Sequence, residues 1–456
     1  MSPSVSHLAP LLPLRYDLTR LASGTSGGLG NVVAPPYDVI SPEDRAALAA
    51  RDPHNVVRLI LPEGELDAKY THAAELLAAW RKEGVLARDI QPAFYGYEQT
   101  FTKPGSKDGK RFTRRGFLGL VRLAPYSEKT VLPHERTLSG PKEDRLKLFR
   151  ATRTNLSPGF LLYRDPAKTL DAPIASGAPL AKFETPDGVT HALTKISDPE
   201  AIRTISEVAS RAPLLIADGH HRYETALRMA GEIEAELVKQ GKAPPPDAPA
   251  SEAPHRFFMV FFTNGDDPGL QVYPTHRHVH DAPGCTFDML LEAAKTLFDV
   301  KLISGDADSY LKELAATERS SFVACAKDGR AALLTLKANA DLAAHPILGQ
   351  QIAELRKTDV AILHAVILEG IWKISKEAQA AKTNLWYPQN AQAALADLRA
   401  GKGDVLFLMN ATPPSVVRDV AEAGEVMPQK STFFYPKVAT GLTIHLLDPA
   451  ALDPEP

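Results

Sequence analysis

The feature that most constrains the fold of this 456-residue chain is that strands with alternating apolar and polar residues occur beside short apolar strands that lead into helices. Residues 93–100 and 115–122 alternate apolar and polar side chains around a turn-forming segment, a pattern that predicts a β-hairpin. Residues 214–217 form a short apolar strand that leads, through a turn, into a helical pattern from Tyr223. Hairpins beside strand–helix units are typical of α+β proteins, so we expect an α+β fold with a mixed-sheet core.

The pattern changes near residue 285. Helices and short strands follow from Thr286, and the last seventy residues return to alternating strands and helices. A length prior of roughly 150 residues per domain allows about three domains, or two larger ones. We expect a mixed-sheet domain over residues 1–284 and a helical, α+β C-terminal region over 285–456, whose last strands (about 404–448) pack back on the core.

Charge and cysteine content exclude several classes of protein. Lys and Arg total 52 against 55 Asp and Glu, and this net charge of −3 makes a dedicated nucleic-acid binder unlikely. The two cysteines, Cys285 and Cys325, have no CxxC spacing, so a disulfide framework and a thiolate zinc site are not expected. No apolar stretch approaches the roughly 18 residues that span a bilayer. We expect a cytoplasmic protein without a membrane segment; its oligomeric state stays open.

The strongest signal for chemistry is Asp218-Gly-His-His-Arg222, where a buried strand ends and a helix begins. The N-terminus of a helix attracts anions, and Gly219 permits a positive φ and the close approach of a ligand. Arg222 offers a bidentate fork for phosphate oxygens, while His220 and His221 add donors. The segment therefore predicts phosphate binding. The alternative is structural, with Asp218 as a helix cap and the histidines solvated or packed.

A second cluster, His134-Glu-Arg136, follows a predicted strand. Glu135 lies between His134 and Arg136 and has the chemistry of a general base. The spacing is not HExxH, which argues against a zinc protease. A charged loop that leads into a solvated helix is the competing interpretation.

Two further segments are candidates for substrate binding. A predicted strand at residues 31–34 ends at two prolines, which fix a rigid turn and present Tyr37 and Asp38. The segment 425–437 carries polar side chains that suit a polyanion, namely Lys430, Ser431, Thr432 and Lys437. A structural turn and a packed loop are the respective alternatives.

Two weaker patterns carry no assignment. His276, His278 and His280 alternate, which on a strand gives either a metal-binding face or a solvated face; without a carboxylate or cysteine companion we assign no metal. The glycine-rich loop 24–30 lacks the preceding strand and following helix of a nucleotide-binding motif.

Four of these segments occur in an order that resembles one bacterial and archaeal family. They are residues 33–41, 134–137, 216–222 and 424–437. The family is catalogued as domain of unknown function 1015 and is often labelled SpoOJ/ParA/ParB/RepB-like. The Asp218–Arg222 element also resembles the phosphate-contacting loop of the ParB/sulfiredoxin superfamily, which includes free serine kinases. The resemblance implies a ParB/sulfiredoxin-like catalytic domain in which Asp218, Gly219, His220, His221 and Arg222 contact nucleotide phosphates.

These features together favour a nucleotide-dependent small-molecule kinase, with ATP or ADP and Mg²⁺ as cofactors and free L-serine as the first candidate acceptor. Phosphoryl transfer needs aligned reactants, neutralised phosphates and a base for the attacking hydroxyl, the role that we give to Glu135. Mg²⁺ would bridge the phosphates through Asp218, and Lys430 would bind the substrate carboxylate. The alternative is a nucleotide-binding, ParB-like regulator that acts on DNA, against which the balanced charge counts.

Overall fold

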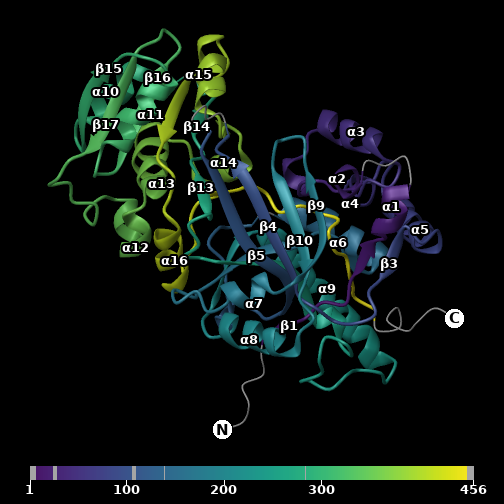
Figure 1. Cartoon of the computed structure of the whole chain (residues 1–456). Coiled ribbons are helices and arrows are strands. Elements are labelled where there is room, and N and C mark those ends of the chain that lie inside the picture. The colour runs from purple at the N-terminus through teal and green to yellow at the C-terminus, as the bar shows by residue number, and fades with distance from the viewer. Residues whose placement is uncertain (1–6, 24–27, 105–108, 138, 283, 449–456) are drawn as a thin grey trace. The chain divides into compact units, whose positions relative to one another are not determined.

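The computed structural model describes residues 7–23, 28–104, 109–137, 139–282 and 284–448 (Figure 1). The chain forms two compact units. Unit 1 contains the residues up to 132, residues 138–270 and the residues from 436 onward; unit 2 contains residues 133–137 and 271–435. Among the described residues, no helix has both the length and the apolar character to cross a membrane.

Unit 1 is built on a nine-stranded mixed sheet with the order β6-β11-β8-β12-β5-β4-β10-β9, and β1 pairs with β5 beside this path. The β11–β6 and β12–β8 pairs are parallel, while the other pairs are antiparallel. The strands of this sheet are β1 (Leu8–Ala9), β4 (Tyr95–Thr102), β5 (Arg111–Arg122), β6 (Val131–Leu132), β8 (Gly159–Tyr163), β9 (Ala178–Glu184), β10 (Thr190–Lys195), β11 (Leu214–Asp218) and β12 (Phe257–Asn264).

Smaller ladders and helices complete unit 1. The ladders join β2 (Leu14–Tyr16) to β3 (Leu86–Arg88), and β21 (His445–Leu446) to β7 (Thr154–Asn155). The helices are α1 (Leu18–Ser23), α2 (Leu29–Val32), α3 (Pro42–Arg51), α4 (Val57–Ile60), α5 (Ala68–Lys82), α6 (Ser139–Thr152), α7 (Asp171–Ala175), α8 (Pro199–Ala209) and α9 (His220–Lys239).

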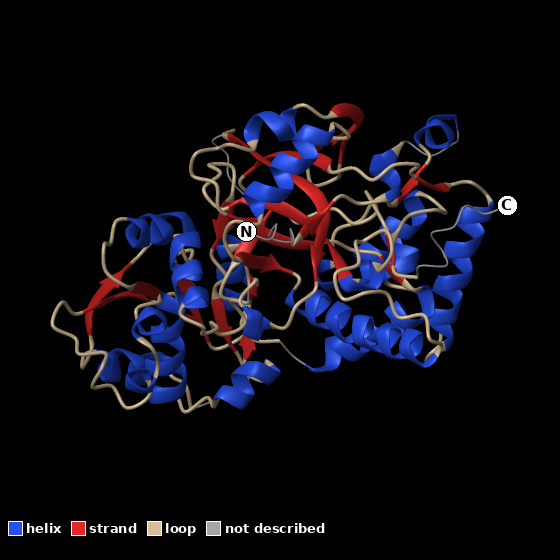
Figure 2. Cartoon of the chain, turned by 90° about the horizontal axis from the view of Figure 1, so that it is seen from below, coloured by secondary structure: helices blue, strands red, loops and turns tan. Residues whose placement is uncertain are grey.

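The core of unit 1 lies between its large sheet and three of these helices. Apolar side chains of β5, β8, β11 and β12 pack against those of α6, α8 and α9. Figure 2 shows the strands in red and the helices in blue. Tyr223, in the first turn of α9, is fully buried in this cluster and exchanges hydrogen bonds with the backbone of Ala124. The start of α9 is therefore fixed against the core.

Unit 2 has a six-stranded, fully antiparallel sheet with the order β15-β17-β16-β19-β14-β18, and a separate β13–β20 ladder. Its strands are β13 (Gln271–Tyr273), β14 (Arg277–Val279), β15 (Phe298–Ile303), β16 (Ser321–Ala326), β17 (Ala331–Leu336), β18 (Leu385–Trp386), β19 (Val405–Met409) and β20 (Phe433–Tyr435). Its helices are α10 (Phe287–Ala294), α11 (Ala307–Ala315), α12 (Ala353–Arg356), α13 (Asp359–Ile362), α14 (Lys376–Ala381), α15 (Ala391–Arg399), α16 (Pro414–Glu422) and a π-helix (Leu363–Ile371).

The mixed sheet beside helices confirms the predicted α+β fold class. The chain leaves unit 1 after Leu270, earlier than the change of pattern near residue 285. Of the last strands, β19 belongs to the sheet of unit 2, whereas β21 pairs with β7 in unit 1. A catalytic role for residues 1–284 stays a prediction.

The predicted strand at residues 31–34 is wrong. Residues 29–32 form helix α2, and Ala34 makes only an isolated bridge to Thr440. The Asn55 amide donates to the carbonyls of Asn31 and Val33, so a side chain occupies the acceptors that a ladder would use. Tertiary contacts thus override the strand propensity of the two valines. Residues 24–27 of the glycine-rich loop lie outside the described residues.

Candidate functional site

The strand–helix junction at Asp218 has the local geometry that its sequence predicts. Strand β11 ends at Asp218, Gly219 adopts φ 96° and ψ 27°, and helix α9 begins at His220. A Cβ atom on Gly219 would lie 3.1 Å from the Arg222 guanidinium, so glycine serves both the left-handed backbone and the close approach of Arg222. The positive end of a 20-residue helix dipole therefore lies beside the Asp218 carboxylate.

The Asp218 carboxylate is held between two cations. Lys437 Nζ donates to Asp218 Oδ2 at 2.6 Å, and Arg222 Nη2 donates to Asp218 Oδ1 at 3.3 Å. Arg222 is 5% exposed, and its Nη1 donates to the carbonyl oxygen of Pro158. The Arg222 guanidinium, which was predicted to bind phosphate, thus makes its hydrogen bonds within the protein. The half-buried Lys437 is the more accessible of the two cations.

A third cation, Arg114 of β5, acts on the same carboxylate and was not identified from the sequence. Its guanidinium is fully buried over the ring of Phe160, and its Nη2 donates to Gln99 and, at 2.6 Å, to the Pro436 carbonyl. Burial lowers the pKa of Arg114 to about 10, and this shift is partly opposed by Tyr97, then by Asp267 and Asp218. Arg114 therefore remains charged at neutral pH.

Two nitrogens of this guanidinium, Nε and Nη1, have no hydrogen-bond partner in the part of the chain that the structure describes. Buried donors without partners are rare and unfavourable. Lys437 and Arg222 contact the Asp218 carboxylate, and the buried Arg114 interacts electrostatically with both Asp267 and Asp218. The junction therefore brings several cations together in a partly desolvated setting, which favours an anion.

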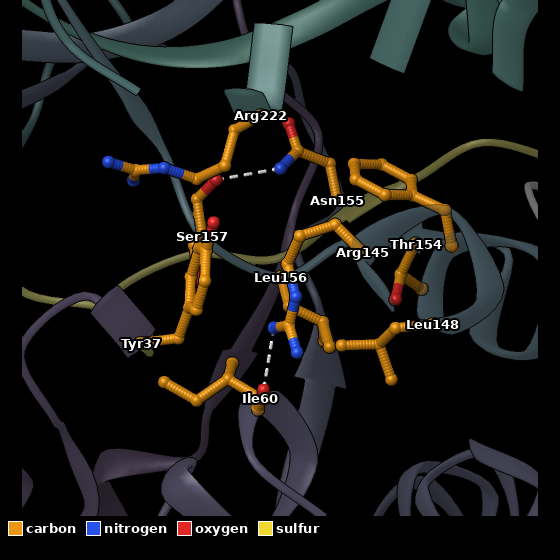
Figure 3. A pocket seen from close by; sticks show the side chains of 10 residues that line it. Tyr37, Ile60, Arg145, Leu148, Thr154, Asn155, Leu156, Ser157 and Arg222 are labelled. Carbon is orange, nitrogen blue, oxygen red and sulfur yellow. Dashed lines mark hydrogen bonds between the residues drawn. The ribbon is translucent and has the colours of Figure 1, made fainter. Parts of the chain in front are cut away.

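A small pocket lies next to this junction in unit 1. Tyr37, Arg145 and Arg222 line it together with residues 154–157 (Figure 3). The Arg145 guanidinium lies 4.2 Å from the centre of the Tyr37 ring, and its Nη1 donates to the Ile60 carbonyl at 2.6 Å. The pocket volume of about 20 Å³ is enough for a water molecule but not for a nucleotide.

The predicted substrate residue Tyr37 is thus brought to the same pocket as Arg222. Burial raises the pKa of Tyr37, and the Asp38 carboxylate raises it further, so the phenol is a neutral donor at neutral pH. Asp38 is exposed in the short turn Tyr37–Val39. His220 is buried and His221 is half-buried in the first turn of α9.

The predicted catalytic segment 134–136 belongs to unit 2, where it pairs with the segment 425–435. Met427 N donates to the His134 carbonyl at 2.8 Å, and Glu135 forms a parallel bridge with Met427. The imidazole of His134 is buried, with Nε2 2.9 Å from the hydroxyl of Thr432. The segments 134–136 and 425–435, which were predicted separately, therefore pack against each other.

Three of the four predicted polyanion ligands, Lys430, Ser431 and Thr432, have structural contacts in unit 2. Ser431 is buried and its hydroxyl donates to the Pro428 carbonyl, while Thr432 contacts His134. Lys430 adopts φ 57°, and its carbonyl accepts from Arg277 Nη2 at 3.1 Å. These contacts agree with the packed-loop interpretation, and substrate binding by the three residues stays a prediction.

The alternating histidines His276, His278 and His280 are buried rather than solvated, and only His278 lies within β14. His276 Nδ1 accepts from Met409 N at 3.2 Å, and the rings of His278 and His280 pack against Trp386. Across the described residues, no group of three or more His, Cys, Asp or Glu side chains could hold a metal ion.

The structure therefore describes a two-unit α+β protein with a cluster of cations at a strand–helix junction. The chain belongs to the family described as "Protein of unknown function (DUF1015)", whose model matches residues 9–361. No curated protein matches the chain significantly.

Several solved structures are similar to parts of this chain. They include a conserved hypothetical protein from Pyrococcus furiosus (15% identity, TM-score 0.35, covering 72% of this chain and 94% of that one). A free serine kinase in complex with AMP has 14% identity and a TM-score of 0.35, covering 73% of this chain and 92% of that one. SbnI from Staphylococcus aureus, with a C-terminal truncation, has 10% identity and a TM-score of 0.33, covering 74% and 88%. These identities and TM-scores are too low to assign the activity of any of these proteins to this chain.

Proposed function

We propose that this protein is a nucleotide-dependent kinase of small molecules, which transfers a phosphoryl group to a hydroxyl, and that free L-serine is the first acceptor to test. The observation that carries the proposal is the Asp218 carboxylate between Lys437 and Arg222 at the N-terminus of α9. Phosphoryl transfer depends mainly on positioning and on neutralising the phosphate charge, which is the chemistry that clustered cations and a helix N-terminus supply.

In this proposal Lys437 and the start of α9 bind the phosphates, while Arg222 positions Asp218. The Lys437 ammonium is 18% exposed and its Asp218 partner 16% exposed, so both are partly accessible to a ligand. Arg222 is bound to Pro158 and Asp218, which suits a positioning role. Arg114 adds charge from within the core.

The predicted Mg²⁺ is treated as part of the nucleotide substrate. Both oxygens of Asp218 are already hydrogen-bonded to cations, so the carboxylate does not fit the role of a resident metal ligand. Mg²⁺ is commonly held by substrate phosphates with one or two carboxylates. L-serine as acceptor rests on the resemblance of the Asp218–Arg222 element alone.

The decisive experiment incubates the purified full chain with ATP, ADP or pyrophosphate, Mg²⁺ and a panel of hydroxyl metabolites that includes L-serine. Mass spectrometry then follows the phosphorylated products. A product that forms with one donor and one acceptor, and that is lost in Lys437→Met but kept in Lys147→Met, supports the proposal. Lys147 is an exposed lysine of the same unit that pairs with Asp67, which makes it a matched control.

If no donor and acceptor give a product, the kinase proposal is wrong. A DNA-binding assay over a range of salt concentrations then tests the regulator alternative, for which affinity should fall steeply with salt.

A further inference from the structure

Unit 2 contains a larger pocket that the proposed kinase chemistry does not use. Its volume is about 270 Å³, just under the range of about 300–1,000 Å³ that is typical for drug-sized ligands. One wall is the π-helix Leu363–Ile371, which contributes His364, Ala365 and Glu369. π-Helical turns are rare and frequently occur at functional sites. The size indicates a single small metabolite.

A chain of hydrogen bonds fixes two side chains that line this pocket, His364 and Gln379. Arg277 Nε, which can only donate, lies 2.9 Å from His364 Nε2, so that this nitrogen must accept. The proton of the neutral imidazole is then on Nδ1, which donates to Gln379 Oε1 at 2.7 Å. The Gln379 amide donates in turn to the Ile374 carbonyl at 2.8 Å. Burial lowers the pKa of His364 to about 3, which keeps the imidazole neutral.

A buried positive charge, Arg277, contacts two of the residues that line the pocket, His364 and Tyr387. Arg277 is fully buried, and its hydrogen bonds go to neutral acceptors, namely His364, the Thr275 carbonyl and the Lys430 carbonyl. Its guanidinium lies 4.9 Å from the centre of the Tyr387 ring, and Tyr387 lines the pocket. Burial lowers the pKa of Arg277 to about 10, so it is charged at neutral pH.

The rest of the lining carries charges of both signs. Arg136 and Lys376 are exposed cations, while Glu369 and Glu425 are half-buried acids. Lys376 Nζ and Glu369 Oε2 form a long ion pair at 4.0 Å, without a hydrogen bond between them. Gln351 Oε1 is a buried acceptor that has no hydrogen-bond partner in the described parts of the chain. The pocket therefore presents both cations and acceptors to a ligand.

We propose that this pocket binds a small zwitterion of the free α-amino acid class. The acids and the Gln351 acceptor would bind the ammonium group, and the cations, supported by the buried Arg277, would bind the carboxylate. A pocket with balanced charges selects against ligands that carry only one sign, because such a ligand leaves the opposite groups unpaired. The proposal stands on unit 2 alone and does not require the kinase activity.

Calorimetric titration of the full chain with the twenty common L-amino acids, L-serine included, tests the proposal. The amide and the N-acetyl derivative of the best ligand are titrated next, since each lacks one of the two charges. We expect at least one amino acid to bind, and each derivative to bind at least tenfold more weakly. If none binds, or if either derivative binds as tightly as its parent, the proposal is wrong.

Two variants test which side chain binds the carboxylate of the ligand and which binds its ammonium group. Lys376→Ala should weaken the amino acid at least tenfold but leave the amide derivative unchanged, because that derivative has no carboxylate. Glu369→Gln should weaken the amino acid but leave the N-acetyl derivative unchanged. Lys357→Ala and Glu354→Gln change exposed charges of unit 2 outside the pocket and should bind as the wild type does.

Equal affinity in all four variants would place the ligand elsewhere and overturn the proposal. Neither Lys376 nor Glu369 belongs to the proposed phosphate site, so a failure here is separate from a failure of the kinase assay.

Discussion

The Lys437 ammonium lies 2.6 Å from Oδ2 of Asp218, a residue 219 positions earlier in the chain. Residue 437 is near the start of the segment that returns to unit 1 after unit 2. Arg114 and Gln99 secure that return through the carbonyls of Pro436 and Lys437, respectively. The charge at the strand–helix junction is thus completed by a distant part of the sequence.

Lys437→Met should weaken nucleotide binding by roughly 10- to 150-fold. Hydrogen bonds to charged groups contribute about 1.5–3 kcal/mol, and a phosphate would lose one of them. Titration of the full chain with ADP and ATP measures the effect. Lys147→Met, which removes an exposed charge from the same unit, should leave the affinity unchanged. Equal affinities in both variants would remove Lys437 from the site.

Gly219→Ala should lower the free energy of unfolding of unit 1 by about 1–2 kcal/mol, because alanine at φ 96° is strained and its Cβ would lie close to Arg222. Gly231→Ala is the matched control on the same helix. There the new Cβ meets nothing within 4 Å, and we expect a gain of about 0.5–1 kcal/mol. Hydrogen exchange of the α9 amides reports both changes.

The stability of unit 1 should fall as the pH drops from 6.5 to 4. Burial lowers the pKa of His191 to about 4, below the ordinary 6.5, so between these values the unfolded chain binds more protons than the folded chain. For His191 alone the loss is at most about 3 kcal/mol, and it levels off below pH 4.

Denaturant titrations at pH 7.0 and 4.5 measure this loss. His191→Gln should make the two unfolding free energies more similar, whereas replacement of the exposed His72 by Gln should not. An unchanged pH dependence in His191→Gln would show that other groups cause it.

Sequence patterns predicted the parts of the site that are local. The strand that ends at Asp218, the turn at Gly219 and the helix that follows are set by neighbouring residues, and the structure has them where expected. Lys437 was noted as a cation suited to a polyanion, but its contact with Asp218 depends on the return of the chain to unit 1. That contact has no local signal.

The residues that were missed or misassigned depend on tertiary contacts. Arg114 lies in an alternating strand where a charged residue normally faces solvent, and only the packed structure reveals its burial over Phe160. The predicted strand at residues 31–34 failed because the Asn55 amide, more than twenty residues away, takes the backbone acceptors. Likewise, the helices predicted after Thr286 gave no sign that one of them, Leu363–Ile371, is a π-helix.

The β13–β20 ladder pairs Gln271 with Tyr435, the first and last residues of the main segment of unit 2. The two ends of that segment consequently lie next to each other, paired as neighbouring strands. Insertions or deletions between these positions change the length of the segment without moving its two paired ends apart. The amino-acid pocket could therefore diverge, or be exchanged for another, while the spacing of Asp218 and Lys437 is preserved.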